Sequence, residues 1–591
     1  MQRTHFKKCL QSVASLGALA LLAACGSMPG DASRSAGSSV PLPPAVKPAV
    51  AATLQQCTAL ASAFRFDNTL IDSVAVQAAG SLKQADKPIG EHCLVKGRMH
   101  PRKAMLAGSE QDFAIGFEMR LPQAWNGRFY YQANGGIDGT VQPALGAHGG
   151  GPITGALLQG FAVVSSDAGH TGRQNPRFGE DPQARADYGY QAVGKLTPMS
   201  KALIAAAYGK GPDRSYIGGC SNGGRHAMIA ASRLQNDYDG FLIGAPGYRL
   251  PNAALAQMWA LPGWQALATP GATMTHPFNP NGSIVNLNTA LTAPERQTVA
   301  NAILAKCDAL DGAKDGLVQD TAACQKAFDL TRDVATCTGA RNGTCLSSEQ
   351  KAQLLAVHQG GKTKGGGNAI YSSFPWDTGI AAANWTSWKF VNAQVLDPAA
   401  GYIFMTPPRS ISNPFALNVD EAYGAIYASN AQFPESANAQ ITPPGKFSPD
   451  NLAPLKSRGA KMLLYHGVSD AIFSHDDTAA WWQRVNDAQG GKAADFARYF
   501  PIPGMAHCSA GGPAADQFDP LTPLVNWVEK GQAPQQLLLA ARGAGNSGGV
   551  NTELPKDWAA QRSRPACAYP QVARYKGAGS LEDAANFSCQ P

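Results

Sequence analysis

A ten-residue stretch determines which fold this chain is expected to have: Tyr216-Ile217-Gly218-Gly219-Cys220-Ser221-Asn222-Gly223-Gly224-Arg225. It contains the pattern Gly-x-Ser-x-Gly, in which a serine lies on a sharp turn between a strand and a helix and the glycines let the flanking backbones pass closely. Residues 213–217 can form the strand, and residues 225–234 form a helical sequence without proline. The pattern therefore predicts a nucleophile elbow with Ser221 as the nucleophile. A glycine-rich turn without catalytic function is the alternative on this motif alone.

Predicted strands and helices alternate on both sides of the elbow. Patterns typical of strands occur at residues 112–121, 127–133, 161–166, 240–244, 461–467 and 497–502, and helical patterns at residues 53–66 and 199–208. The apolar run at 161–166 indicates a strand that is covered on both faces. This alternation predicts a mostly parallel sheet, and together with the elbow it predicts an α/β-hydrolase fold.

The alternation breaks down between about residues 249 and 454. This stretch is rich in Asn, Thr, Gly and Pro and holds five of the ten tryptophans, most of which we expect in a hydrophobic core. Because it is far longer than an ordinary loop, it predicts a lid domain inserted into the sheet. The predicted division is a signal peptide at 1–25, a flexible tether at 26–52, a catalytic domain at 53–248 and 455–591, and the lid at 249–454.

The beginning of the chain indicates export. Basic residues precede an apolar segment, 10–24, that is too short to span a bilayer. It ends in Leu22-Ala23-Ala24-Cys25, which resembles a lipobox with Cys25 as the lipidated residue; a plain cleaved secretory signal is the alternative. We therefore expect an outer-membrane-anchored lipoprotein or a periplasmic or secreted protein, most simply a monomer.

Composition agrees with export. Besides Cys9 and Cys25 the chain has ten cysteines, an even number that predicts disulfides in an oxidising compartment. The absence of any Cys-x-x-Cys pair argues against zinc. The formal net charge of +7 is spread without a basic run, so no nucleic-acid partner is expected.

Two further residues complete a catalytic triad with Ser221. In this fold the acid and the base follow the nucleophile, each in a loop after a strand. Asp470 follows the predicted strand 461–467, and His507 follows the predicted strand 497–502. His507 is expected to take the serine proton, and Asp470 to orient the imidazole. His475 with Asp476 or Asp477 is a weaker choice for the base and the acid. His466 and His170 are expected to be structural.

The neighbours of the triad suggest two more features. Cys220 precedes the nucleophile and Cys508 follows the base, so a bridge between them is expected if Ser221 and His507 meet, with two free thiols as the alternative. The oxyanion hole is expected to combine the N–H of Asn222 with that of Gly136, since glycine allows close approach to a substrate oxygen.

An aspartate-rich loop lies within the predicted lid. Asp308, Asp311 and Asp315 are spaced so that their carboxylates can surround a Ca²⁺ ion together with backbone carbonyls. The loop is not an EF-hand, because the twelfth position is Gln319. Ordinary Asp-Gly turns are the alternative.

Several motifs together resemble the tannase/feruloyl esterase family, and within it the branch of mono(2-hydroxyethyl) terephthalate hydrolases. They extend from about Cys57 to Cys589 and include Trp125-Asn126-Gly127-Arg128-Phe129, Gly219-Cys220-Ser221, Cys307-Asp308-Ala309-Leu310-Asp311-Gly312, Tyr465-His466-Gly467-Val468-Ser469-Asp470 and Pro503-Gly504-Met505-Ala506-His507-Cys508. The resemblance implies a secreted serine carboxylic-ester hydrolase that cleaves small aromatic-acid esters, of terephthalate, ferulate or gallate type, through an acyl-enzyme.

The resemblance also implies particular residues. The Ca²⁺ ligands would be Asp308, Asp311 and Asp315 with the carbonyls of Ala313 and Leu317. The disulfides would be Cys57–Cys93, Cys220–Cys508, Cys307–Cys324, Cys337–Cys345 and Cys567–Cys589. The substrate pocket would include Trp388, Phe473 and Gly135.

The chain departs from the branch in its predicted pocket. Asn222 replaces a glutamate, Gly135 replaces a serine, and the lid arginine that holds a substrate carboxylate has no clear counterpart, with Lys389 or Arg409 as candidate substitutes. The alternatives to an esterase are a non-catalytic surface lipoprotein that binds aromatics or polysaccharide, and an acyltransferase with the same triad.

Overall fold

The computed structural model describes residues 47–147, 151, 153, 155–442 and 452–591. The predicted signal peptide, Cys25 and most of the predicted tether lie outside the described residues. The last tether residues belong to the fold, because Ala52–Thr53 (β1) pairs with Ala124–Trp125 (β7). In the part of the chain that the structure describes, no helix is long and apolar enough to cross a bilayer.

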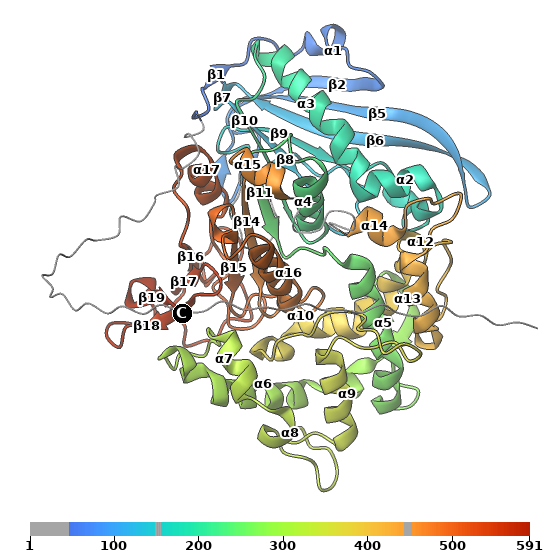
Figure 1. The fold of residues 1–591 in the computed structure, drawn as a ribbon, viewed down its shortest axis with the longest axis vertical. Coiled ribbons are helices and arrows are strands. Elements are labelled where there is room, and N and C mark those ends of the chain that lie inside the picture. The colour runs from blue at the N-terminus through green and yellow to red at the C-terminus, as the bar shows by residue number, and fades with distance from the viewer. Residues whose placement is uncertain (1–46, 148–150, 152, 154, 443–451) are drawn as a thin grey trace, which may run out of the picture. The chain divides into compact units, whose positions relative to one another are not determined.

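A nine-stranded sheet forms the centre of the fold (Figure 1). Its strands lie in the order β15-β14-β11-β10-β8-β9-β6-β5-β2. Their bounds are β2 Thr69–Gln77, β5 His92–Leu106, β6 Ser109–Pro122, β8 Arg128–Gln132, β9 Ala162–Ser166, β10 Arg214–Cys220, β11 Gly240–Gly244, β14 Lys461–Gly467 and β15 Ala497–Ile502. The predicted α/β class is confirmed, and the strands predicted at 240–244, 461–467 and 497–502 have these same bounds.

The sheet is parallel in one part and antiparallel in the other. The six strands from β15 to β9 pair in parallel, whereas β6, β5 and β2 pair antiparallel. The reason is local: β5 and β6 are joined by the two-residue turn Ala107-Gly108, in which both residues have positive φ. Such a turn joins only antiparallel strands. The sheet is therefore mixed, with its parallel part around the elbow.

One predicted helix is much shorter than expected. Of residues 53–66, only Leu60–Ala63 (α1) are helical. Thr53 is held in a strand by β7, and Cys57 is bonded to Cys93 on β5. These tertiary contacts outweigh the local helical pattern.

Helices cover both faces of the parallel strands. Helices α3 (Ala192–Tyr208), α4 (Asn222–Arg233) and α16 (His475–Ala488) share one hydrophobic core with apolar side chains of the sheet. Helix α17 (Leu521–Lys530) packs into a second core on alternate residues of the same strands, such as Tyr216 and Leu242. All five residues of β9 are buried, as its apolar pattern predicts.

A mainly helical segment connects β11 to β14, which are neighbours in the sheet (green to orange in Figure 1). Its larger elements are α5 Leu250–Leu267, β12 Thr273–His276, β13 Asn279–Val285, α6 Ala293–Cys307, α7 Thr321–Ala327, α8 Leu330–Asp333, α9 Ser348–His358, α10 Ala383–Thr386, the π-helix η7 Ser387–Asn392, α13 Val419–Tyr427 and α14 Ala437–Ile441. Trp264, Trp385 and Phe390 pack edge to face inside its own core. The domain boundaries stay a prediction, because the described residues belong to one compact unit.

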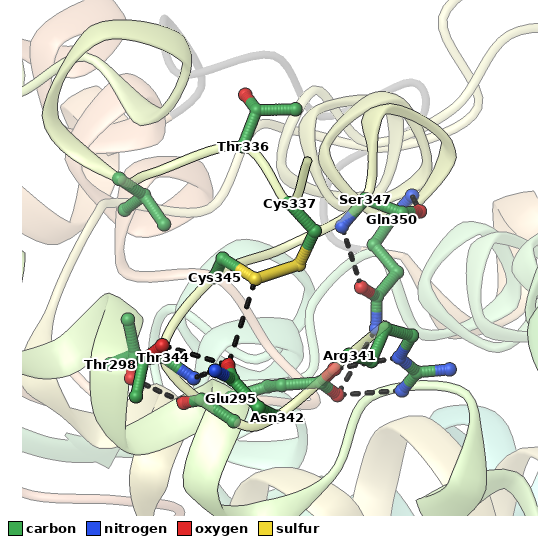
Figure 2. Close-up of a disulfide and its surroundings, with 12 residues drawn as sticks. Glu295, Thr298, Thr336, Cys337, Arg341, Asn342, Thr344, Cys345, Ser347 and Gln350 are labelled. Atoms are coloured by element: carbon green, nitrogen blue, oxygen red, sulfur yellow. Dashed lines mark hydrogen bonds and ion pairs between the residues drawn. A yellow bond between two sulfur atoms is a disulfide. The ribbon is translucent and has the colours of Figure 1, made fainter. Parts of the chain in front are cut away.

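Five disulfides brace the part of the chain that the structure describes. They are Cys57–Cys93, Cys220–Cys508, Cys307–Cys324, Cys337–Cys345 and Cys567–Cys589, the pairs that the family resemblance implied. The Cys337–Cys345 bridge closes a short lid loop whose Arg341 forms an ion pair with Glu295 of α6 at 2.7 Å (Figure 2). Gln350 of α9 donates to the same carboxylate at 3.1 Å, so the loop is attached to two helices.

Candidate active site

Ser221 lies in a strained turn between β10 and α4. Its φ of 66° and ψ of −126° are unusual for a residue with a side chain, and they are typical of a nucleophile elbow. The two glycines of the motif are required by close packing. A Cβ on Gly219 or on Gly223 would lie 2.3 Å from the carbonyl oxygen of Ala133, the residue that follows β8. The Gly-x-Ser-x-Gly pattern thus holds the serine at the carboxyl end of the central strands.

The structure brings Ser221, His507 and Asp470 together in one hydrogen-bonded chain. The Ser221 Oγ is 2.8 Å from His507 Nε2, and His507 Nδ1 is 2.7 Å from Asp470 Oδ2. Because a carboxylate only accepts, Nδ1 carries the proton and Nε2 is free to accept the serine proton. Asp470 is fully shielded, with a side chain 0% exposed, while Ser221 is half-buried.

Asp470 is held as an anion by its surroundings. Burial by itself would raise its pKa, but the charges and hydrogen bonds of His507 and His466 outweigh burial and hold the pKa below its ordinary value. The N–H groups of Ile472 and Phe473 donate to Oδ1 at 2.9 and 3.1 Å. His466, expected to be structural, contributes through Nε2, 3.2 Å from Oδ2.

The weaker acid–base candidates make other contacts. His475 bonds through Nδ1 to the hydroxyl of Tyr499, and Asp477 forms an ion pair with Arg249. His170, expected to be structural and not an acid or base, stacks on Phe178.

The bridge between Cys220 and Cys508 joins the neighbours of the serine and the histidine. Their Cα atoms are 6.0 Å apart. The histidine loop is thereby covalently attached to the elbow, although 288 positions separate the two cysteines. This attachment limits how far His507 can move from Ser221.

Gly135 lies beside Ser221, and Gly136 follows it in the loop after β8. Both glycines are exposed, and a Cβ on Gly135 would lie 3.8 Å from the Cβ of Ser221. Gly136 has a φ of 67°, which favours glycine at this position. Asn222 is the first residue of α4, where backbone N–H groups have no partner within the helix. The two N–H groups expected to form an oxyanion hole therefore lie on elements that meet at Ser221.

Aromatic rings flank the imidazole. The rings of Trp388 and Phe473 stand edge-on to His507, with centroids 5.4 and 5.2 Å away. Phe473 also belongs to a small apolar cluster with Tyr371 and Phe374, which sequence reasoning did not single out. Both of these residues lie in the lid segment Tyr371-Ser372-Ser373-Phe374, and only the proximity of two aromatic residues marks that segment in the sequence.

Lys389 and Arg409, the two candidates for binding a substrate carboxylate, are both engaged in other contacts. Arg409 forms an ion pair with Glu421. Lys389 is buried, with its ammonium 3.5 Å from the centre of the Phe374 ring. Burial lowers the pKa of Lys389 to about 7, against the opposing influence of Asp470 and Asp397.

The aspartate-rich loop is folded back on itself. Asp308 Oδ1 accepts the N–H groups of Asp315 and Gly316 at 3.0 Å, and Asp311 Oδ1 accepts the N–H of Ala313. The other oxygen of Asp311, Oδ2, is buried without a hydrogen-bond partner. Burial, together with the charges of the two other aspartates, raises the pKa of Asp311 to about 7.

This loop fits a cation only in part. Among the residues that the structure describes, no group of three or more His, Cys, Asp or Glu side chains is arranged to hold a metal ion. Asp315 instead forms ion pairs with Arg562 and Arg564. The unpartnered oxygen of Asp311 is the feature that fits a cation, because a buried anionic oxygen without a donor is unstable by itself.

The fold and the geometry of the site define a class. A serine on a strand–turn–helix elbow, followed in sequence by an aspartate and a histidine that meet it, is the arrangement of α/β-hydrolases that transfer acyl groups. Comparisons with known proteins give the family within this class. The family model described as tannase and feruloyl esterase matches residues 99–590. The chain belongs to this family of carboxylic ester hydrolases.

Individual relatives agree with the family. The mono(2-hydroxyethyl) terephthalate hydrolase of Piscinibacter sakaiensis is 36% identical over 562 residues, which cover 88% of this chain and 88% of that protein. A probable feruloyl esterase B-1 of Aspergillus fumigatus is 29% identical over 80% of this chain and 82% of its own length. The solved structure of feruloyl esterase B from Aspergillus oryzae has a TM-score of 0.69 at 26% identity, covering 90% of this chain and 99% of that one.

Proposed function

We propose that this protein is an exported serine esterase that hydrolyses small aromatic-acid esters through an acyl-enzyme. The observation that carries the proposal is the pair of hydrogen bonds from Ser221 to His507 and from His507 to Asp470. A neutral imidazole with its proton fixed on Nδ1 can act as a general base toward the serine hydroxyl.

The proposed reaction has two halves. Ser221 Oγ attacks the ester carbonyl while His507 Nε2 takes its proton, and the carbonyl oxygen becomes an oxyanion that accepts hydrogen bonds from the N–H groups of Gly136 and Asn222. When the intermediate collapses, the C–O bond breaks and His507 returns the proton to the leaving alcohol. Water then attacks the acyl-enzyme by the same steps, releasing the acid and regenerating Ser221.

The aromatic rings beside His507 support an aromatic acyl group. Trp388 and Phe473 contact the imidazole on which the reaction depends, so a planar acid bound to Ser221 would lie against them. The named relatives are a terephthalate ester hydrolase and a probable feruloyl esterase, and the acid part of each of these esters is aromatic. The ion pair of Arg409 and the burial of Lys389 give no support to a free carboxylate as a required part of the substrate.

The test is hydrolysis by the wild type and by Ser221→Ala. We expect the wild type to cleave methyl ferulate, methyl gallate or mono(2-hydroxyethyl) terephthalate and Ser221→Ala to lose about 10⁴-fold or more in kcat while still binding the acid product. A p-nitrophenyl ester should give a burst of p-nitrophenol from the wild type. No turnover by the wild type would favour a binding lipoprotein, and competition of added alcohols with water would favour an acyltransferase.

We further propose that a Ca²⁺ ion occupies the aspartate-rich loop. Asp308, Asp311 and Asp315 with the carbonyls of Ala313 and Leu317 would hold it, and the unpartnered Oδ2 of Asp311 supports this choice. The ion would supply positive charge to a buried anionic loop, and it takes no part in the ester chemistry.

The proposed export rests on the disulfides, which form in oxidising compartments. Lipidation of Cys25 is part of the same proposal. Mass spectrometry of the mature N-terminus from the native host tests it: a diacylglycerol on Cys25 supports an anchor, and an unmodified N-terminus contradicts it.

A further inference from the structure

A buried polar network connects the two elements that carry the proposed oxyanion N–H groups. It joins Asp138, on the loop after β8, to Asn222 and His226 at the start of α4. The side chains of Asp138 and His226 are 2% and 3% exposed, so water does not compete for these contacts. The mechanism proposed above uses none of these side chains.

One oxygen of Asp138 accepts both hydrogen bonds from α4. Asn222 Nδ2 donates to Oδ2 at 2.7 Å, and His226 Nε2 lies 2.9 Å from the same oxygen. Burial and the neighbouring charge of Arg225 lower the pKa of His226, which favours the neutral imidazole. Because the carboxylate only accepts, the ring proton is assigned to Nε2, which donates it to Asp138 Oδ2.

The far end of the Asn222 amide is also fixed. Arg225, 0% exposed, donates from Nε to Asn222 Oδ1 at 2.6 Å. Its two terminal nitrogens donate to the carbonyls of Gly189 and Tyr188, each at 2.9 Å. Asn222 is therefore held between a buried anion and a buried cation, which allows its side chain one orientation.

The Asp138 loop is tied down from its other side by backbone contacts. His170 Nε2 donates to the carbonyl of Ile137 at 2.9 Å, and Asn175 Nδ2 donates to the carbonyl of Asp138 at 3.1 Å. Asp138 has a φ of 54°, a left-handed conformation that aspartate tolerates better than most residues with a side chain. The carboxylate thus forms side-chain hydrogen bonds that join this loop to α4.

We propose that Asp138 is a positioning residue of the oxyanion hole. By linking its own loop to Asn222, the carboxylate sets the separation and direction of two N–H groups, those of Gly136 and Asn222, that come from elements 86 positions apart in the chain. A developing oxyanion gains most from donors whose positions are fixed before the reaction. The inference rests on the proposed serine esterase function.

The main test compares Asp138→Ala with the wild type on an ester that the wild type hydrolyses. Because the carboxylate acts on groups that bind the transition state, kcat should fall about 10- to 100-fold while KM stays within about 3-fold. Phenylboronic acid, whose tetrahedral adduct on Ser221 resembles the intermediate, should bind more weakly by the same factor. Affinity for the aromatic acid product should be unchanged.

Two variants separate positioning from folding. Asp138→Asn keeps an acceptor oxygen and tolerates the left-handed backbone, so it should retain kcat within about 5-fold. Asp181→Ala removes another carboxylate, 11% exposed, which pairs with Arg102 and belongs to no part of the proposed oxyanion hole, and it should lower the melting temperature while leaving kcat and boronate affinity near wild type.

The outcomes are distinct. Three results would each overturn the positioning role. The first is that Asp138→Ala keeps the wild-type kcat and boronate affinity, and the second is that Asp138→Asn and Asp138→Ala lose kcat equally. The third is that product binding falls by the same factor as kcat. If the wild type neither hydrolyses esters nor binds the boronate, the serine esterase function itself has failed.

Discussion

Lys389 places an ionisable amine in the interior beside the candidate active site. Its ammonium has the face of Phe374 as a neighbour, and the buried Asp397 and Asp470 lie close enough to affect its charge. Aromatic and carboxylate neighbours favour the cation, but desolvation dominates and lowers the pKa of Lys389 from 10.5 to about 7. The protonation of this residue therefore contributes to stability in a pH-dependent manner.

The sign of this contribution follows from proton binding. Between pH 7 and 10.5 the unfolded chain holds the proton on Lys389 and the folded chain does not, so this residue makes the protein more stable as pH rises. Lys389→Met removes the buried cation, and its gain in unfolding free energy over the wild type should be largest at pH 6 and shrink toward pH 10. Urea unfolding of both proteins at several pH values measures this difference in unfolding free energy. A constant difference across this range would contradict a lowered pKa.

At the scale of elements, one short π-helix in the segment between β11 and β14 brings an aromatic ring to the site. Residues Ser387–Asn392 (η7) follow α10 directly, and wider π turns of this kind are frequent at functional sites. Trp388, half-buried, stands at the imidazole edge, while Phe390 from the same turn is buried in the lid core with Trp264. The turn therefore anchors one aromatic ring in the lid and presents another to the site.

Because Trp388 faces the site and Phe390 is buried in the core, we predict that Trp388→Ala has an effect that depends on the substrate. Loss of a ring contact worth about 0.7–1.4 kcal/mol should raise KM about 3- to 10-fold for methyl ferulate, whose acyl group is aromatic. For methyl butyrate, with the same leaving group, KM should change less than 2-fold. Steady-state kinetics with the two esters measures it. Equal changes for both esters would show that the ring does not contact the acyl group.

At the scale of the whole molecule, the aspartate-rich loop joins the lid to the end of the chain. Asp315 forms ion pairs with Arg562 and Arg564, near and on β17 (Ser563–Cys567), and Asp320 pairs with Arg574 on β18 (Val572–Tyr575). All of these carboxylates are buried. The loop is therefore a junction whose charge balance affects how the lid and the C-terminal strands stay together.

Removal of divalent cations should weaken this junction. Because an ion that binds only the folded state stabilises it, excess EDTA should lower the melting temperature by about 3–6 °C, and added CaCl₂ should restore it. Asp311→Asn, which removes the unpartnered charge, should melt at the same temperature with and without EDTA. Differential scanning calorimetry measures the melting temperatures with and without EDTA, and elemental analysis gives the metal content. An unchanged wild-type melting temperature together with no bound calcium would refute the proposed site.

The sequence by itself determined the parts of the fold that depend on local pattern. Residues 240–244, 461–467 and 497–502 are strands as predicted, because short apolar runs bounded by turn residues fit a buried parallel sheet and little else. The elbow was also predictable, since the packing of Gly219 and Gly223 against neighbouring backbone requires those residues locally. The order of Ser221, Asp470 and His507 followed from the order of the strands.

Tertiary structure alone decided the antiparallel pairing of β6 with β9, the Asp138 network and the cluster of Tyr371 and Phe374. No sequence motif marks Asp138, because its partners are chosen by how the loop after β8 packs on α4, 84 and 88 positions away. The aromatic cluster likewise forms where lid and sheet segments meet. Local sequence specifies which backbone each segment can adopt, whereas burial of distant segments against one another decides which side chains share a site.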